Sequence, residues 1–157
     1  MQTLQPLIAD IAFFKGLKEE HLALITGCAS NVRVEAGTFV GRAGDPADQF
    51  WVVREGRMAL ELVVPGRGRI TIATMAEGEV VGFSWLLPPY HLHFDVRAVT
   101  ETRALVFDGR CLRGKCASDT TLGFELLSRF SRVMADRIRA MSLQLLDVYG
   151  DHPIESE

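Results

Sequence analysis

The spacing of apolar residues along the chain changes character twice. Before about residue 30, apolar residues recur every three or four positions, which is typical of amphipathic helices. From residue 31 to 108 the apolar runs are short and alternate with polar residues, and glycine or proline separates them. From residue 109 to 149 the helical spacing returns, and a polar tail covers 150–157. The pattern predicts a single domain over 1–157, with helices in 1–30, a β-barrel in 31–108 and helices in 109–149.

The strand region shows repeated turn signals. Met58–Val64 and Arg69–Met75 flank Pro65–Gly68, which predicts a β-hairpin. Phe94–Val99 alternates apolar and polar residues, as expected for a strand with one buried face. Closely spaced turns of this kind favour an antiparallel β-roll or jelly-roll barrel over a parallel sheet.

The C-terminal part predicts one long helix that begins near Ser118 or Asp119, either of which could cap it, and ends near Gly150. Apolar residues along it form a heptad seam, which predicts a homodimer. A second apolar set on a neighbouring face is expected to pack on the barrel; the alternative is that both faces pack within one chain. The heptad seam consists of Leu127, Ser131, Met134, Ile138, Met141, Leu145 and Val148, and the second set of Leu122, Leu126, Phe130 and Val133.

Composition and charge exclude several classes of protein. A net charge of -3 and a pI near 5.8 argue against a protein that binds nucleic acid through positive charge. The three cysteines, Cys28, Cys111 and Cys116, have neither zinc-ligand nor redox-motif spacing, so we expect reduced thiols. The chain shows no signal peptide and no apolar run long enough to span a membrane. We therefore expect a soluble, cytoplasmic protein without a membrane partner.

Several stretches together resemble a known family. Phe14–Leu17 resembles its opening bend, Gly44–Val53 its first hairpins, Gly78–Gly82 its phosphate-binding cassette and Val96–Ala98 the strand that follows. The family is that of the cyclic nucleotide-binding domains of catabolite-activator-type regulators and kinase regulatory subunits, and the resemblance covers about residues 10–149. It implies a regulatory domain, with no catalysis, in which cassette and long helix are coupled.

The resemblance also implies specific ligand contacts, and the sequence departs from them. In the family an acidic residue after the second cassette glycine binds the ribose, and an arginine followed by a hydroxyl residue binds the cyclic phosphate. These positions hold Phe83, Leu92 and His93 here. Two lost contacts to a charged group would weaken binding by about two to four powers of ten. The degenerate ligand-binding site comprises Gly78, Glu79, Gly82, Phe83, Ser84, Trp85, Leu92, His93, Met141 and Ser142, the last two aligned with base-contacting positions.

Two interpretations of the cassette remain open. Its apolar, aromatic segment from Phe83 to Phe94 either binds an apolar or neutral ligand or fills the nucleotide space and closes it. Ser84 is expected to cap a short cassette helix with Trp85 in its first turn. Arg97 is expected to lie on the outer face of its strand and not to replace the missing arginine. No cofactor is certain; a cyclic nucleotide is the possible ligand.

The sequence is less compatible with other functions. A transcription factor of this family carries a helix-turn-helix after the long helix, and only the acidic tail follows here, so direct DNA binding is not expected. His91, His93 and Asp95 could share one face of a strand and bind a metal, although the rest of a cupin motif is missing. A haem ligand among these histidines stays an alternative, while Cys28 alone cannot hold an iron–sulfur cluster. The protein partner is not identified by the sequence.

Overall fold

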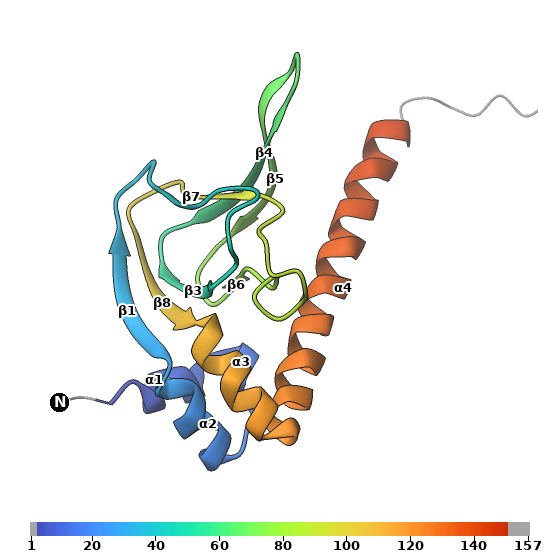
Figure 1. Ribbon diagram of the computed structural model, residues 1–157. Coiled ribbons are helices and arrows are strands. Elements are labelled where there is room, and N and C mark those ends of the chain that lie inside the picture. The colour runs from blue at the N-terminus through green and yellow to red at the C-terminus, as the bar shows by residue number, and fades with distance from the viewer. Residues whose placement is uncertain (1–2, 151–157) are drawn as a thin grey trace, which may run out of the picture.

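The computed structural model describes residues 3–150 and consists of a β-roll between short N-terminal helices and a long C-terminal helix (Figure 1). The helices are α1 (Gln5–Asp10), the 3-10 turn η1 (Ala12–Phe14), α2 (Glu19–Thr26), α3 (Gly109–Ser118) and α4 (Thr120–Gly150). The strands are β1 (Ala29–Val34), β2 (Phe39–Gly41), β3 (Gln49–Glu55), β4 (Met58–Val64), β5 (Gly68–Met75), β6 (Val80–Val81), β7 (Asp95–Ala98) and β8 (Thr102–Asp108).

The strands form two antiparallel four-stranded sheets, in the orders β1-β8-β3-β6 and β2-β7-β4-β5. The predicted hairpin is confirmed: β4 pairs with β5 from Met58 opposite Met75 to Val64 opposite Gly68. Side chains that alternate along these strands meet between the sheets, where Trp51, Met58 and Val96 are buried. The antiparallel roll expected from the turn signals is therefore the observed architecture.

A second apolar cluster joins the first sheet to the helices. The rings of Phe50 and Phe107 stack with centroids 4.4 Å apart, and Phe14 lies against Phe107. Phe130 of α4 meets Phe50 edge-on at 5.2 Å. Burial of aromatic side chains contributes strongly to stability, so this cluster fixes where α4 leaves the β-roll.

The expectation of reduced thiols is wrong for two of the three cysteines. Cys28 and Cys111 form a disulfide, while Cys116 is free and half-buried. The sequence separation of 83 residues hid the pair, but the fold brings the end of α2 beside the start of α3, with 5.9 Å between the Cα atoms. This distance lies in the range that a disulfide can bridge.

The long helix α4 begins as predicted, because the Asp119 carboxylate accepts a hydrogen bond from the Leu122 N–H at 3.1 Å. Leu122, Leu126 and Phe130 are fully buried against the rest of the domain, as expected for the second apolar set. Further along, α4 rises beside the β-roll and its last turns stand clear of it (Figure 1). The expected polar tail falls, after Gly150, outside the described residues. Within residues 3–150, no helix is long and apolar enough to cross a bilayer.

Candidate ligand-binding site

The cassette begins as a glycine turn but does not continue as a helix. Gly78 and Gly82 have φ values of +84° and +94°, which favour glycine, and the Gly78 N–H donates to the Val53 carbonyl. After Gly82 the chain makes hydrogen-bonded turns, with the Leu87 N–H donating to the Ser84 carbonyl at 3.3 Å. The expected cassette helix is therefore absent between residues 83 and 90. Pro88 and Pro89 explain this, since proline lacks an N–H and disfavours helix before it.

Trp85 occupies the interior beneath the cassette. Its side chain is fully buried, stacks on Phe50 at 5.1 Å and meets Phe130 edge-on at 5.5 Å. The indole Nε1 is buried and has no hydrogen-bond partner. The tryptophan therefore serves as an apolar filler that joins the cassette, β3 and α4.

Leu92 lies where the family resemblance places the phosphate-binding arginine. It is 9% exposed, and a Cβ added at Gly41 would come within 2.5 Å of its Cδ1. Backbone hydrogen bonds with Asp45 and Gly44 hold Leu92 in place, while the neighbouring His93 is exposed. A leucine packed on a glycine of β2 therefore takes the position of the missing cation.

Almost no free space remains at the cassette. The cavity measures about 20 Å³, room for about one water molecule, since a water needs roughly 10–15 Å³ on this measure. Leu60, Gly82, Phe83, Ser84, Leu92, His93, Phe94, Val96 and Arg137 line it. A nucleotide does not fit there in this conformation.

Two arginines from the flanking helices fasten the cassette. Arg113 of α3 donates to the carbonyl of Trp85 at 2.6 Å, and its guanidinium lies 4.3 Å from the ring centre of Tyr90. Arg137 of α4 donates to the carbonyl of Val80, and burial lowers the pKa of its guanidinium. Arginine stays protonated in proteins, so both contacts are charge-assisted. Sequence patterns gave no indication of these roles, because each contact joins residues more than 20 positions apart.

Arg97 lies outside the roll, as predicted. Val96 and Ala98 are buried, whereas Arg97 makes two hydrogen bonds, of 2.6 and 3.0 Å, to the Glu61 carboxylate. Its hydrogen bond is the main cause that lowers the pKa of Glu61. Asp95, expected on the solvated face, is 8% exposed because the Ala43 N–H and Arg69 cover it. The pKa of Asp95 is lowered, chiefly by the hydrogen bond from Ala43.

His91, His93 and Asp95 do not form a metal site. Asp95 is already bonded to Ala43 and Arg69, and His91 and His93 are exposed. Among the residues that the structure describes, no group of three or more His, Cys, Asp or Glu side chains could hold a metal ion.

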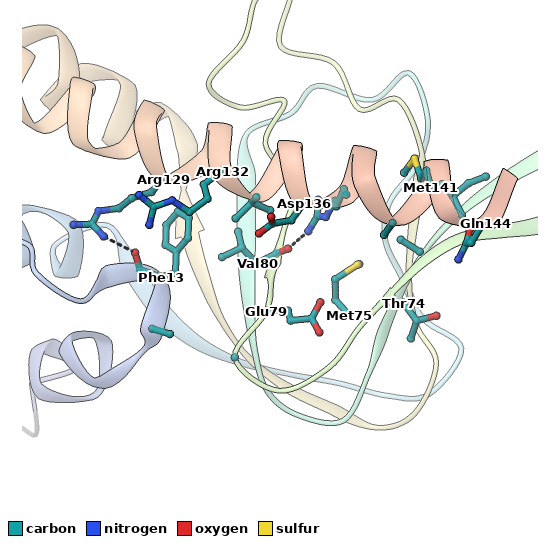
Figure 2. A pocket seen from close by; sticks show the side chains of 17 residues that line it. Phe13, Thr74, Met75, Glu79, Val80, Arg129, Arg132, Asp136, Met141 and Gln144 are labelled. Carbon is teal, nitrogen blue, oxygen red and sulfur yellow. Dashed lines mark hydrogen bonds between the residues drawn. The ribbon is translucent and has the colours of Figure 1, made fainter. Parts of the chain in front are cut away.

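The remaining predicted site residues do not gather at the cassette cavity. Gly78, Glu79 and Met141 line a separate groove of about 550 Å³ between β5, β6 and α4 (Figure 2). Ser142 is exposed, and its hydroxyl donates to the Ile138 carbonyl one turn earlier. From α4, it is Arg137 and not Met141 or Ser142 that reaches the cassette.

Comparison with known proteins agrees with this fold. The chain is 27% identical over 96% of its length to a candidate potassium channel protein of Rhodopseudomonas palustris. It is 24% identical over 94% of its length to a CRP-like cAMP-activated global transcriptional regulator of Mycobacterium tuberculosis. The chain spans 35% and 64% of the lengths of these two relatives.

A solved structure gives the same result for the fold. The structure of a candidate cyclic nucleotide-binding protein from Geobacter metallireducens superimposes with a TM-score of 0.78 at 23% identity, over 88% of this chain and 99% of that one. The sequence profile of the cyclic nucleotide-binding domain matches residues 31–119, from β1 to the end of α3. The chain belongs to the cyclic nucleotide-binding domain family.

Proposed function

We propose that this protein is a non-catalytic regulatory domain whose cassette is closed to cyclic nucleotides and which acts as a homodimer through α4. The observation that carries the proposal is the volume of the cassette cavity, about 20 Å³, where Leu92 and Phe83 stand at the positions of the family's polar ligand contacts. Leu92 offers no charge to a phosphate, and burial of an unpaired phosphate would be costly. Regulation then depends on contacts with another protein and not on a second messenger.

Calorimetric titration of ligand-stripped protein with cyclic AMP and cyclic GMP tests the closed cassette. We expect no heat of binding and no thermal shift at millimolar nucleotide, because the cavity is too small for a nucleotide and Arg137, which lines it, already donates to the Val80 carbonyl. A dissociation constant in the micromolar range would contradict the proposal and identify the protein as a cyclic-nucleotide receptor.

The dimer proposal rests on the exposed heptad seam of α4. Ile138 and Val148 are 66% and 67% exposed in the single chain, and Leu127 and Leu145 are also exposed. Phe124, at the spacing of seven residues before Ser131, is exposed too and lengthens the seam by one heptad. Met134 and Met141 are half-buried at its edge. An apolar helix face of this length requires a partner, and a second copy supplies an identical seam.

Ile138→Asp is expected to raise the dimer dissociation constant about 100-fold. Burying an unpaired carboxylate costs roughly 2–3 kcal/mol or more, and each 1.4 kcal/mol changes the constant tenfold. Light scattering at micromolar protein would give 17.4 kDa for the variant and twice that mass for the native protein.

Leu143→Asp is the matched control for the dimer. Leu143 is 58% exposed on the same part of α4 but lies off the seam. The control should remain dimeric. A native protein that is monomeric at micromolar concentration, or a dimer that both variants weaken equally, would refute the seam as the interface.

A further inference from the structure

We propose that the groove between β5, β6 and α4 is a binding site for a small amphipathic anion, an apolar body with one carboxylate or similar head group. The groove is separate from the cassette cavity and much larger, about 550 Å³ against about 20 Å³. Its volume falls in the range of about 300–1,000 Å³ that is usual for small-molecule sites. This site goes beyond the proposed function and does not depend on cassette closure, and it shares Met141 with the proposed dimer seam.

The walls of the groove are mainly apolar. β5 contributes Ile72, Ala73 and Met75, and α4 contributes Val133 and Met141. Met141 is half-buried and presents a flexible thioether side chain that adapts to an apolar ligand, whereas Met75 is fully buried. Such a lining favours a ligand whose body is a hydrocarbon chain or ring.

One end of the groove carries positive charge. Arg129 and Arg132 lie beside Phe13 at this end (Figure 2). Arg129 is held by the carbonyls of Phe13 and Lys15 and forms an ion pair with Glu125 at 3.4 Å, while its Nε is buried without a hydrogen-bond partner. Arg132 is exposed and makes no hydrogen bond or ion pair within the described part of the chain. Its guanidinium is therefore available for bidentate binding of a carboxylate.

The acidic side chains of the groove do not cancel this charge. Glu79 lies near Arg137, whose pKa it raises against the effect of burial. Asp136 is one turn beyond Arg132 and forms no ion pair with it within 4.0 Å. Of the three arginines that line the groove, Arg129 pairs with Glu125 and Arg137 lies near Glu79, so Arg132 is the one without an ion pair within the described part of the chain. The head group is therefore expected to be a single negative charge at Arg132.

The far end of the groove is polar and uncharged. Gln144 and Thr74 lie there, next to Met141 (Figure 2). Twelve residues of α4 separate Arg132 from Gln144, about 18 Å along the helix axis. An unbranched carboxylate can extend from Arg132 past Val133 towards Gln144, with its head group in solvent contact and its chain against Met141.

Titration with decanoate, and with 1-decanol as the uncharged counterpart, tests the site by calorimetry on the full chain. We expect decanoate to bind at submillimolar concentration with one site per chain. Arg132→Gln should weaken decanoate about tenfold, since a hydrogen-bonded charge is lost at a partly exposed position. Decanol should bind more weakly than decanoate and should not respond to this variant.

Two further variants separate the groove from the rest of α4. Ala140→Phe fills the groove and should abolish decanoate binding, whereas Arg139→Gln, an exposed arginine on the same helix that does not line the groove, should leave it unchanged. The absence of decanoate binding at millimolar concentration would overturn the proposal. So would equal losses in Arg132→Gln and Arg139→Gln, or full binding in Ala140→Phe, because either result would place the ligand on the exposed apolar surface of α4.

Discussion

Trp85→Ala is expected to destabilise the domain by about 3–5 kcal/mol, the usual cost of truncating a fully buried large aromatic side chain. Trp85 joins three parts of the molecule, since it stacks on Phe50 of β3, meets Phe130 of α4 and belongs to the cassette itself. Alanine would leave a cavity bordered by rigid β-strands, which can collapse only in part. Urea unfolding followed by circular dichroism measures the loss.

Two variants control this result. Trp85→Phe keeps the stacking and removes the unpaired indole N–H, so we expect it to cost less than half as much as Trp85→Ala. Leu87→Ala alters an exposed apolar residue of the same segment and should change stability by less than about 0.5 kcal/mol. A loss below about 1 kcal/mol for Trp85→Ala would mean that the cassette does not pack on the core as described.

The triple variant Phe83→Glu, Leu92→Arg, His93→Ser is expected to bind cyclic AMP with an affinity about two to four powers of ten higher than that of the native protein. Each charged hydrogen bond restored to the ligand contributes about 1.5–3 kcal/mol, and each 1.4 kcal/mol changes affinity tenfold. The substitutions also remove the leucine packed on Gly41 and one of the aromatic walls of the cavity. Calorimetry with cyclic AMP measures the gain.

Leu92→Arg alone is the control that restores the positive charge but does not enlarge the cavity. It should bind cyclic AMP more weakly than the triple variant, because Phe83 still borders the cavity. If the triple variant folds with its native thermal midpoint but gives no heat with millimolar nucleotide, the expectation is wrong. Lack of space in the cavity would then prevent nucleotide binding more than the lack of charged contacts does. Trp85 and the contacts from α3 and α4 would keep the cavity small.

Much of the fold could be predicted because its signals are local. The hairpin around Pro65–Gly68 follows from turn residues between two runs of alternating apolar and polar residues. Asp119 caps α4 through a hydrogen bond to a residue only three positions away. On α4, Leu127, Ile138, Leu145 and Val148 of the predicted heptad seam are exposed, and the dimer itself stays a prediction. The resemblance to cyclic nucleotide-binding domains likewise depends on glycines and turns whose spacing the fold requires.

The site was less predictable because its contacts are distant in sequence. The disulfide between Cys28 and Cys111 joins residues 83 positions apart, and no spacing rule indicates it. Arg113 and Arg137 reach the cassette from helices that the sequence presents only as amphipathic. The predicted cassette helix is absent because Pro88 and Pro89 downstream outweigh the capping signal at Ser84. Tertiary contacts decide the disulfide and the two arginine contacts, whereas the local effect of two prolines decides the cassette segment.

The disulfide between Cys28 and Cys111 has a mechanical consequence. All eight strands lie between these two cysteines in the chain, so the bond closes a covalent ring that contains the whole β-roll. A pulling force applied between α1 and the far end of α4 would pass from α2 through the sulfur atoms directly into α3. The strands would carry none of that tension while the bond is intact, and reduction of the bond would place the entire roll in the line of force.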